Sequence, residues 1–137
     1  MTGFSNDSSP DGRPLRLSRV ATVAPNGPVE FVLTGSCGRV IGRLRFRTCQ
    51  KCRTGRILDL WICEAWQRQG LGRELVCLLM AHCRGYRWNT TLQSHPGRAF
   101  FTAMTQETSV SLRHGSPLCP HLMGRLRRTW RRLFRVC

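Results

Sequence analysis

The chain has 137 residues, which is room for one domain with a sizeable core. Hydrophobic residues make up 41% of it, well above disordered sequence, and no run of about 18 apolar residues predicts a membrane span. The amino terminus is polar and lacks the apolar stretch of a secretory signal, so we expect a cytoplasmic protein.

The formal net charge of +15 is extreme for this size, and it comes from arginine, because Lys51 is the only lysine. An arginine bias of this kind is typical of a GC-rich, bacterial-type genome. Whatever its origin, the positive field favours anionic partners such as the phosphates of a cofactor, nucleic acid or acidic lipid.

Residues 1–14 are rich in Ser, Asp, Asn, Gly and Pro, and we expect them to be a disordered leader. Loosely alternating apolar residues predict a first strand over 15–24. The sequence Pro-Asn-Gly-Pro at 25–28 is typical of a turn, and a second strand is expected over 29–34.

Alternation is clearest from Val40 onwards, where apolar residues and arginines occupy opposite faces of a predicted strand. A polar, turn-like stretch over 48–55 separates it from an apolar run over 57–63. The two strands are expected to form an antiparallel hairpin, and the second one to be central in the sheet.

The best helix in the chain is predicted over 70–84, because its leucines recur at helical spacing and Gly85 stands where a helix stop belongs. Aromatic and β-branched residues predict a strand over 86–92. A second helix is expected over 96–106, and a last strand over 110–113.

We expect the domain to span 15–115 and the remaining residues, 116–137, to form a basic C-terminal extension. Arginines interleaved with Leu, Trp and Phe predict an amphipathic helix over 122–136. Its apolar stripe is expected to pack on the domain. Binding of RNA, DNA or an acidic membrane surface by these arginines is the alternative.

The most informative segment lies between the central strand and the best helix, at Gln67-Arg68-Gln69-Gly70-Leu71-Gly72. Its glycines let the backbone approach an anion, and the helix start offers unpaired N–H groups and the positive end of the helix dipole. Arg68 and Arg73 can add charge-assisted contacts. The segment predicts a phosphate or pyrophosphate seat. A G-x-G-x-x-G pattern fails at Leu75, and no P-loop is present.

The same segment resembles motif A of the GNAT superfamily of N-acetyltransferases, whose signature is [Gln/Arg]-x-x-Gly-x-[Gly/Ala] after a hydrophobic strand. Gln67, Gly70 and Gly72 stand at the three defining positions, and Ile62 at the usual aliphatic strand end. The likeness continues through the next strand and helix. It implies an α/β (α+β) fold with a mixed, mostly antiparallel sheet, and transfer of an acetyl group from acetyl-CoA to an amine by direct attack.

The resemblance also implies a cofactor site between the fourth and fifth strands of the family. Backbone groups at the end of the central strand are expected to hold the pantetheine arm and polarise the thioester carbonyl, and amides of the glycine turn to cradle the pyrophosphate. The expected cofactor-binding residues are Trp61, Ile62, Cys63, Gln67, Arg68, Gln69, Gly70, Leu71, Gly72, Arg73, Ser94 and Phe101.

Three features depart from the family pattern. Ser94 stands nearest the place of a frequent Asn. Phe101 stands where a Tyr general acid is common, and it cannot donate a proton. The two helices that usually wall the substrate site have no room between the first two strands. We therefore expect an acceptor site that is open or completed by a second copy in a homodimer.

Asp59 on the central strand is the first candidate for a catalytic base, acting through water, and Glu64 at the strand exit is the second. The plainer interpretation pairs Asp59 with a neighbouring arginine and leaves Glu64 in a solvated turn. The acceptor is expected to be a small-molecule or peptide amine. A non-catalytic acyl-CoA-binding module and a basic nucleic-acid-binding protein are the alternative functions.

Two of the eight cysteines, Cys49 and Cys52, have the spacing of metal ligands. Zinc needs four ligands, and Cys119 and His121 have a matching short spacing. The sequence does not show whether the two segments meet. The favoured interpretation is a hairpin loop with two free thiols and no metal.

Overall fold

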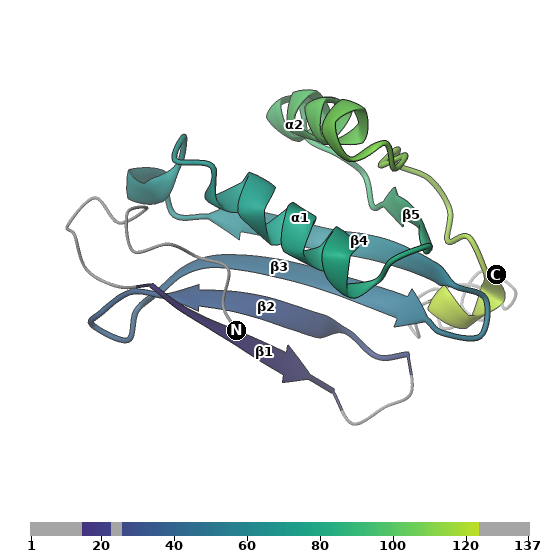
Figure 1. Ribbon diagram of the computed structural model, residues 1–137, viewed down its shortest axis with the longest axis horizontal. Helices are drawn as coiled ribbons and strands as arrows, with labels where there is room; N and C mark the ends of the chain where they lie inside the picture. Colours follow the sequence, from purple (N-terminus) through teal and green to yellow (C-terminus); the bar gives the residue numbers. More distant parts are fainter. Residues whose placement is uncertain (1–14, 23–25, 124–137) are drawn as a thin grey trace, which may run out of the picture.

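The computed structural model describes residues 15–22 and 26–123 of the chain. Five strands form one sheet in the order β1-β2-β3-β4-β5, α1 lies across one face of it, and α2 lies beyond β5 (Figure 1). The elements are β1 (Arg16–Ala21), β2 (Val29–Thr34), β3 (Val40–Cys49), β4 (Thr54–Ile62), η2 (Glu64–Trp66), α1 (Leu71–His82), β5 (Arg87–Thr90), α2 (His95–Thr108) and η3 (Pro120–Leu122).

The sheet is mixed and mostly antiparallel, as the resemblance implied. Strands β1 to β4 pair antiparallel in sequence order, whereas β5 pairs parallel to β4. A parallel neighbour needs a crossover connection, and α1 supplies it between β4 and β5. The expected hairpin of β3 and β4 is confirmed, but its strands are longer than predicted, since Thr48, Cys49, Thr54 and Gly55 all belong to the ladder.

Helix α1 carries the main core on one stripe. Leu71, Leu75, Val76 and Leu79 are each at most 1% exposed, and they belong to the same apolar cluster as Phe31, Leu44 and Ile57 of the sheet. Burial of one such side chain stabilises the fold by about 1.5–3 kcal/mol. The helix ends at His82, and Gly85 adopts a φ of 79°, in agreement with the stop that the sequence predicted.

One irregularity in the β3–β4 ladder determines where the site forms. Arg45 pairs with Asp59 and Phe46 pairs with Ile57, so Leu58 is an extra residue in β4. A bulge of this kind bends a strand and increases its twist. The ladder between β4 and β5 runs from Thr54 to Ile57 and stops there.

Two predicted elements differ from the structure. Residues 110–113 form no strand, and a single bridge joins His114 to Thr90 instead. Most of the predicted helix over 122–136 lies outside the described residues, as does the leader at 1–14, and Leu122 itself ends η3. In the described part of the chain, no helix is long and apolar enough to cross a membrane.

Gly55 in β4 lies directly under the indole ring of Trp88 in β5. A Cβ atom at Gly55 would come within 2.4 Å of the ring, so Gly55→Ala forces Trp88 to move. We expect a loss of about 1–3 kcal/mol in the free energy of unfolding, the usual cost of overpacking a core. Gly35→Ala is the matched control, because its Cβ would meet Ile41 at an ordinary 3.8 Å. Urea denaturation that ranks the two variants equally would contradict this packing argument.

Candidate functional site

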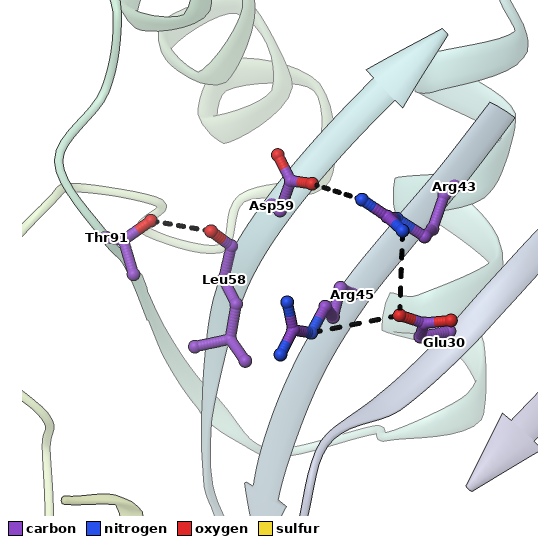
Figure 2. Close-up of polar contacts among 6 residues, drawn as sticks. All are labelled: Glu30, Arg43, Arg45, Leu58, Asp59 and Thr91. Carbon is purple, nitrogen blue, oxygen red and sulfur yellow. Dashed lines mark hydrogen bonds and ion pairs between the residues drawn. The ribbon is translucent and has the colours of Figure 1, made fainter. Parts of the chain in front are cut away.

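A cleft of about 650 Å³ opens where β4 and β5 separate. Two hydrogen bonds mark its start: the Thr91 amide donates to the Ile57 carbonyl at 3.0 Å, and the Thr91 hydroxyl donates to the Leu58 carbonyl at 2.8 Å. Figure 2 shows the second of them. From Leu58 to Ile62, β4 has no partner in β5. This edge of the strand therefore faces the cleft without a neighbouring strand, and the side chains of Thr91 and Gln67 reach the carbonyls of Leu58 and Ile62.

The cleft gathers segments that are far apart in the sequence, namely the second half of β4, the glycine turn, the start of α1, residues 90–94 and the first turns of α2. Most of the expected site residues line it. They are Asp59, Trp61, Ile62, Gln67, Arg68, Gly70, Leu71, Gly72, Arg73, Ser94 and Phe101. Cys63, Gln69 and Glu64 were also expected at the site, but they do not line the cleft.

The glycine turn has the conformation that an anion seat requires. Gly70 precedes α1 with a left-handed φ of 78°, which favours glycine, and no side chain caps the helix. A Cβ atom at Gly70 would meet nothing within 4 Å, so it would project into open space. The first amides of a helix have no partner within it, and here they lie at the cleft. At Gly72 a Cβ would meet Phe100 at an ordinary 3.5 Å, which fits a signature that accepts Ala.

The side chain of Gln67 has a structural part that the sequence did not indicate. Its amide nitrogen donates to the Ile62 carbonyl at 2.9 Å, which ties the turn to the end of β4. The Cys63 amide donates to the Ile41 carbonyl of β3 at 2.7 Å. Its N–H is therefore engaged within the sheet, which argues against the expected contact of that amide with a thioester.

The two arginines that flank the turn are in different situations. Arg73 donates to the Glu107 carboxylate of α2 at 2.6 Å, and this contact raises the pKa of Arg73. Arg68 is exposed and makes no ion pair among the described residues. Next to Arg73, burial raises the pKa of Glu74, and the charge of Arg73 offsets part of this effect. Arg68 is thus the side chain best placed to meet an anion.

Asp59 belongs to a network of four charged side chains on β2, β3 and β4 (Figure 2). Its carboxylate lies 3.2 Å from Arg43, whose other contact, Glu30, also pairs with Arg45. The pairing with a neighbouring arginine is therefore present. The Asp59 side chain is 45% exposed, so this ion pair contributes little to stability. Asp59 also borders a second hollow, of about 370 Å³, together with Val40, Arg43, Leu60 and Trp61.

The remaining candidates are placed as follows. Glu64 is exposed in η2, which agrees with the plainer interpretation of a solvated turn. Ser94 caps α2, since its hydroxyl accepts from the Gly97 amide at 3.2 Å. Phe101 is 8% exposed and packs edge-on against Phe100, with its ring at the cleft. A phenylalanine has no acidic proton, so Phe101 cannot act as a general acid.

The class of protein is defined by three features in sequence: a strand that diverges from its parallel neighbour, a glycine turn and an amphipathic helix. The Acetyltransferase (GNAT) family model matches residues 7–104, and the chain belongs to this family. Members of the family generally use acetyl-CoA, and the family assignment indicates acetyl transfer. No curated protein matches the sequence.

Solved structures of acetyltransferases share the fold at low sequence identity. A Deinococcus radiodurans R1 protein assigned to the acetyltransferases has a TM-score of 0.57 at 15% identity, covering 88% of this chain and 94% of its own. An aminoglycoside acetyltransferase from an uncultured soil metagenomic sample, solved with sisomicin, has a TM-score of 0.51 at 15% identity, with coverages of 80% and 97%. For Tetrahymena GCN5 the TM-score is 0.51 at 19% identity, and the match covers 56% of this chain and 49% of that one, about half its length.

Gly70 offers a direct test of the anion seat. We expect Gly70→Leu to weaken CoA binding about tenfold to a hundredfold in isothermal titration, the loss of one or two charge-assisted hydrogen bonds. Gly85→Leu is the matched control. Gly85 has nearly the same φ, 79°, and equally open surroundings, but it lies at the other end of α1. Both variants carry a similar backbone strain of about 1–2 kcal/mol. Equal CoA affinity in the two would rule out the seat.

Proposed function

We propose that this protein transfers the acetyl group of acetyl-CoA to the amine of a small-molecule or peptide acceptor. The observation that carries the proposal is the cleft between β4 and β5, with the glycine turn of α1 at its mouth. The turn amides and Arg68 would hold the pyrophosphate. The end of β4 that has no ladder with β5, at Trp61 and Ile62, would hold the pantetheine arm and the thioester.

In this arrangement the acceptor amine enters the hollow beside Asp59 and Trp61 and attacks the thioester carbonyl across β4. The reaction depends mainly on holding the two reactants in line. The ammonium form must first lose a proton, and in this proposal Asp59, which borders both the cleft and the hollow, would accept it through water. Of the two carboxylates that the sequence suggested, the proposal rests on Asp59 alone.

The charges around the site favour some classes of acceptor over others. Around the hollow, Glu30 and Asp59 are balanced by Arg43 and Arg45, so these described side chains create no negative potential that would concentrate a polycation. The chain as a whole carries +15. Both features disfavour polycationic acceptors and favour an amine on a neutral or acidic molecule.

The alternative is a non-catalytic acyl-CoA-binding module, and Phe101 is the observation in its favour. A buried ring at the cleft leaves the departing thiolate without a proton donor from α2. The nucleic-acid alternative depends on the arginines of residues 125–135, which lie outside the described residues.

One pair of experiments separates enzyme from module. Isothermal titration measures acetyl-CoA binding, and release of free thiol over a panel of neutral, acidic and polycationic amines measures transfer. The proposal expects binding together with turnover for at least one neutral or acidic amine. Binding with no turnover on any amine would favour the module, and absence of binding would contradict both.

Asp59→Asn tests the assignment of the base. We expect kcat to fall about 10²–10⁴-fold while CoA affinity and melting temperature stay close to those of the wild type, because the lost ion pair is largely exposed. Glu30→Gln is the matched control, since Glu30 pairs with the same Arg43 but lies on β2 and outside the cleft. Equal turnover in both variants would show that Asp59 is not the base and serves only in the ion pair with Arg43.

Phe101→Tyr tests the missing acid. If Phe101 stands where a proton donor acts, a hydroxyl placed there should raise kcat by up to about 10²-fold, with little change in KM for acetyl-CoA. Phe100→Tyr is the control, because the two rings are in contact but Phe100 faces Gly72. A Phe101→Tyr variant that folds normally and is no faster than the control would exclude this position from proton transfer.

A further inference from the structure

Four cysteine and histidine side chains that the acetyl-transfer proposal does not use meet at one place. Cys49 ends β3, and Cys52 lies in the turn before β4. Cys119 directly precedes η3, and His121 lies within it. Figure 1 shows η3, the short yellow coil, beside the β3–β4 turn, at the end of the sheet where β4 begins. The ligand-type atoms of all four residues lie within 4.8 Å of one another. The sequence left open whether the two segments meet, and in the structure they do.

The two sulfur–nitrogen distances from His121 are close to those of a tetrahedral centre. The Nδ1 atom of His121 lies 3.4 Å from the Sγ atom of Cys49 and 3.4 Å from that of Cys52. In a tetrahedral zinc site the bond lengths give a sulfur–nitrogen edge of about 3.6 Å and a sulfur–sulfur edge of about 3.8 Å. Only small movements are needed to bring the four atoms to bonding distance of one ion.

Hydrogen bonds hold two of the sulfur atoms in place. The Cys52 amide donates to the Cys49 Sγ atom at 3.4 Å, and the Thr54 hydroxyl donates to the Cys119 Sγ atom at 3.1 Å. Hydrogen bonds of this outer kind orient the ligands of a metal. Thr54 is itself fully buried, so the hydrogen of its hydroxyl is donated to this sulfur and not to water. Cys49 and Cys119 are 1% and 8% exposed and form, with Leu122, a small core separate from the main one.

We propose that Cys49, Cys52, Cys119 and His121 bind one structural Zn²⁺ ion. Three sulfurs and one imidazole nitrogen are a ligand set that zinc prefers, and with four protein ligands no position is left for a substrate or catalytic water. Binding releases the protons of the three thiols and leaves a centre of net charge −1, which suits the cationic surface. This inference is independent of the acetyl-transfer proposal.

The ion would act as a cross-link between distant parts of the chain. After α2, the segment up to residue 123 is held to the sheet by the bridge at His114, by buried Leu112 and by η3. Arg47 already fastens η3, because its guanidinium donates to the Leu122 carbonyl at 3.0 Å. Zinc would add two bonds from the hairpin and two from this segment, and so fix η3 against the end of β3.

Metal analysis of the full-length protein, expressed without a polyhistidine tag in zinc-supplemented medium, tests the proposal. We expect about one zinc per chain for the wild type, as a closed four-ligand site requires. The reduced, metal-free protein titrated with Co²⁺ should develop the visible absorption of a tetrahedral cobalt–thiolate site. Refilling with zinc should bleach that absorption and raise the melting temperature.

Two ligand variants and one control keep the test independent of misfolding. His121→Asn removes an exposed ligand, and Cys52→Ser removes a half-buried one, so both proteins are expected to fold and to lose zinc and the cobalt spectrum. Cys37→Ser, which removes an exposed cysteine outside the cluster, should retain both. Less than about a tenth of a zinc per wild-type chain, with no cobalt spectrum in the reduced protein, would overturn the proposal. A full complement of iron would overturn the identity of the metal, and equal zinc in all variants would overturn the ligand set.

Discussion

The separation of β4 from β5 is the constraint on which the rest of the site depends. The extra residue Leu58 turns the strand just as its ladder with β5 ends, and the crossover through α1 places a helix start at the opening. A continuous parallel ladder would have satisfied the backbone groups of β4 and left no cleft. In the proposed function, this edge of β4 supplies the binding surface, and the glycine turn and Arg68 would meet the anion.

Much of the fold could be predicted from the sequence, because its periodicities are strong. Strand β2 was predicted at its observed bounds, and α1 within two residues at each end. The hydrophobic positions of α1 recur at helical spacing, and Gly85 marks its end. The family assignment followed from Gln67, Gly70 and Gly72, since these residues carry the turn chemistry themselves. The fold class and the family expectation are confirmed.

What could not be predicted depends on contacts between distant segments. Residues 110–113 have the composition of a strand, yet they do not pair with β5. The segment contacts β5 through a single bridge, between His114 and Thr90. The partner of Asp59 among many arginines is set by register, and a bulge changes register without a sequence signal. The two halves of the cysteine and histidine cluster are far apart in the sequence, with 72 positions between Cys49 and His121, so their meeting is a property of the three-dimensional fold.

The short ladder between β4 and β5 has a consequence for how the cleft can vary among proteins of this kind. Only four residue pairs, closed at one end by the Arg87 amide on the Arg53 carbonyl and at the other by Thr91, determine the angle at which the two strands part. Gly55 and Trp88 pack in the middle of that ladder. Gly55 and Trp88 do not line the cleft, so substitutions at these two residues can change its width, and with it the size of molecule admitted, without altering a group that lines it.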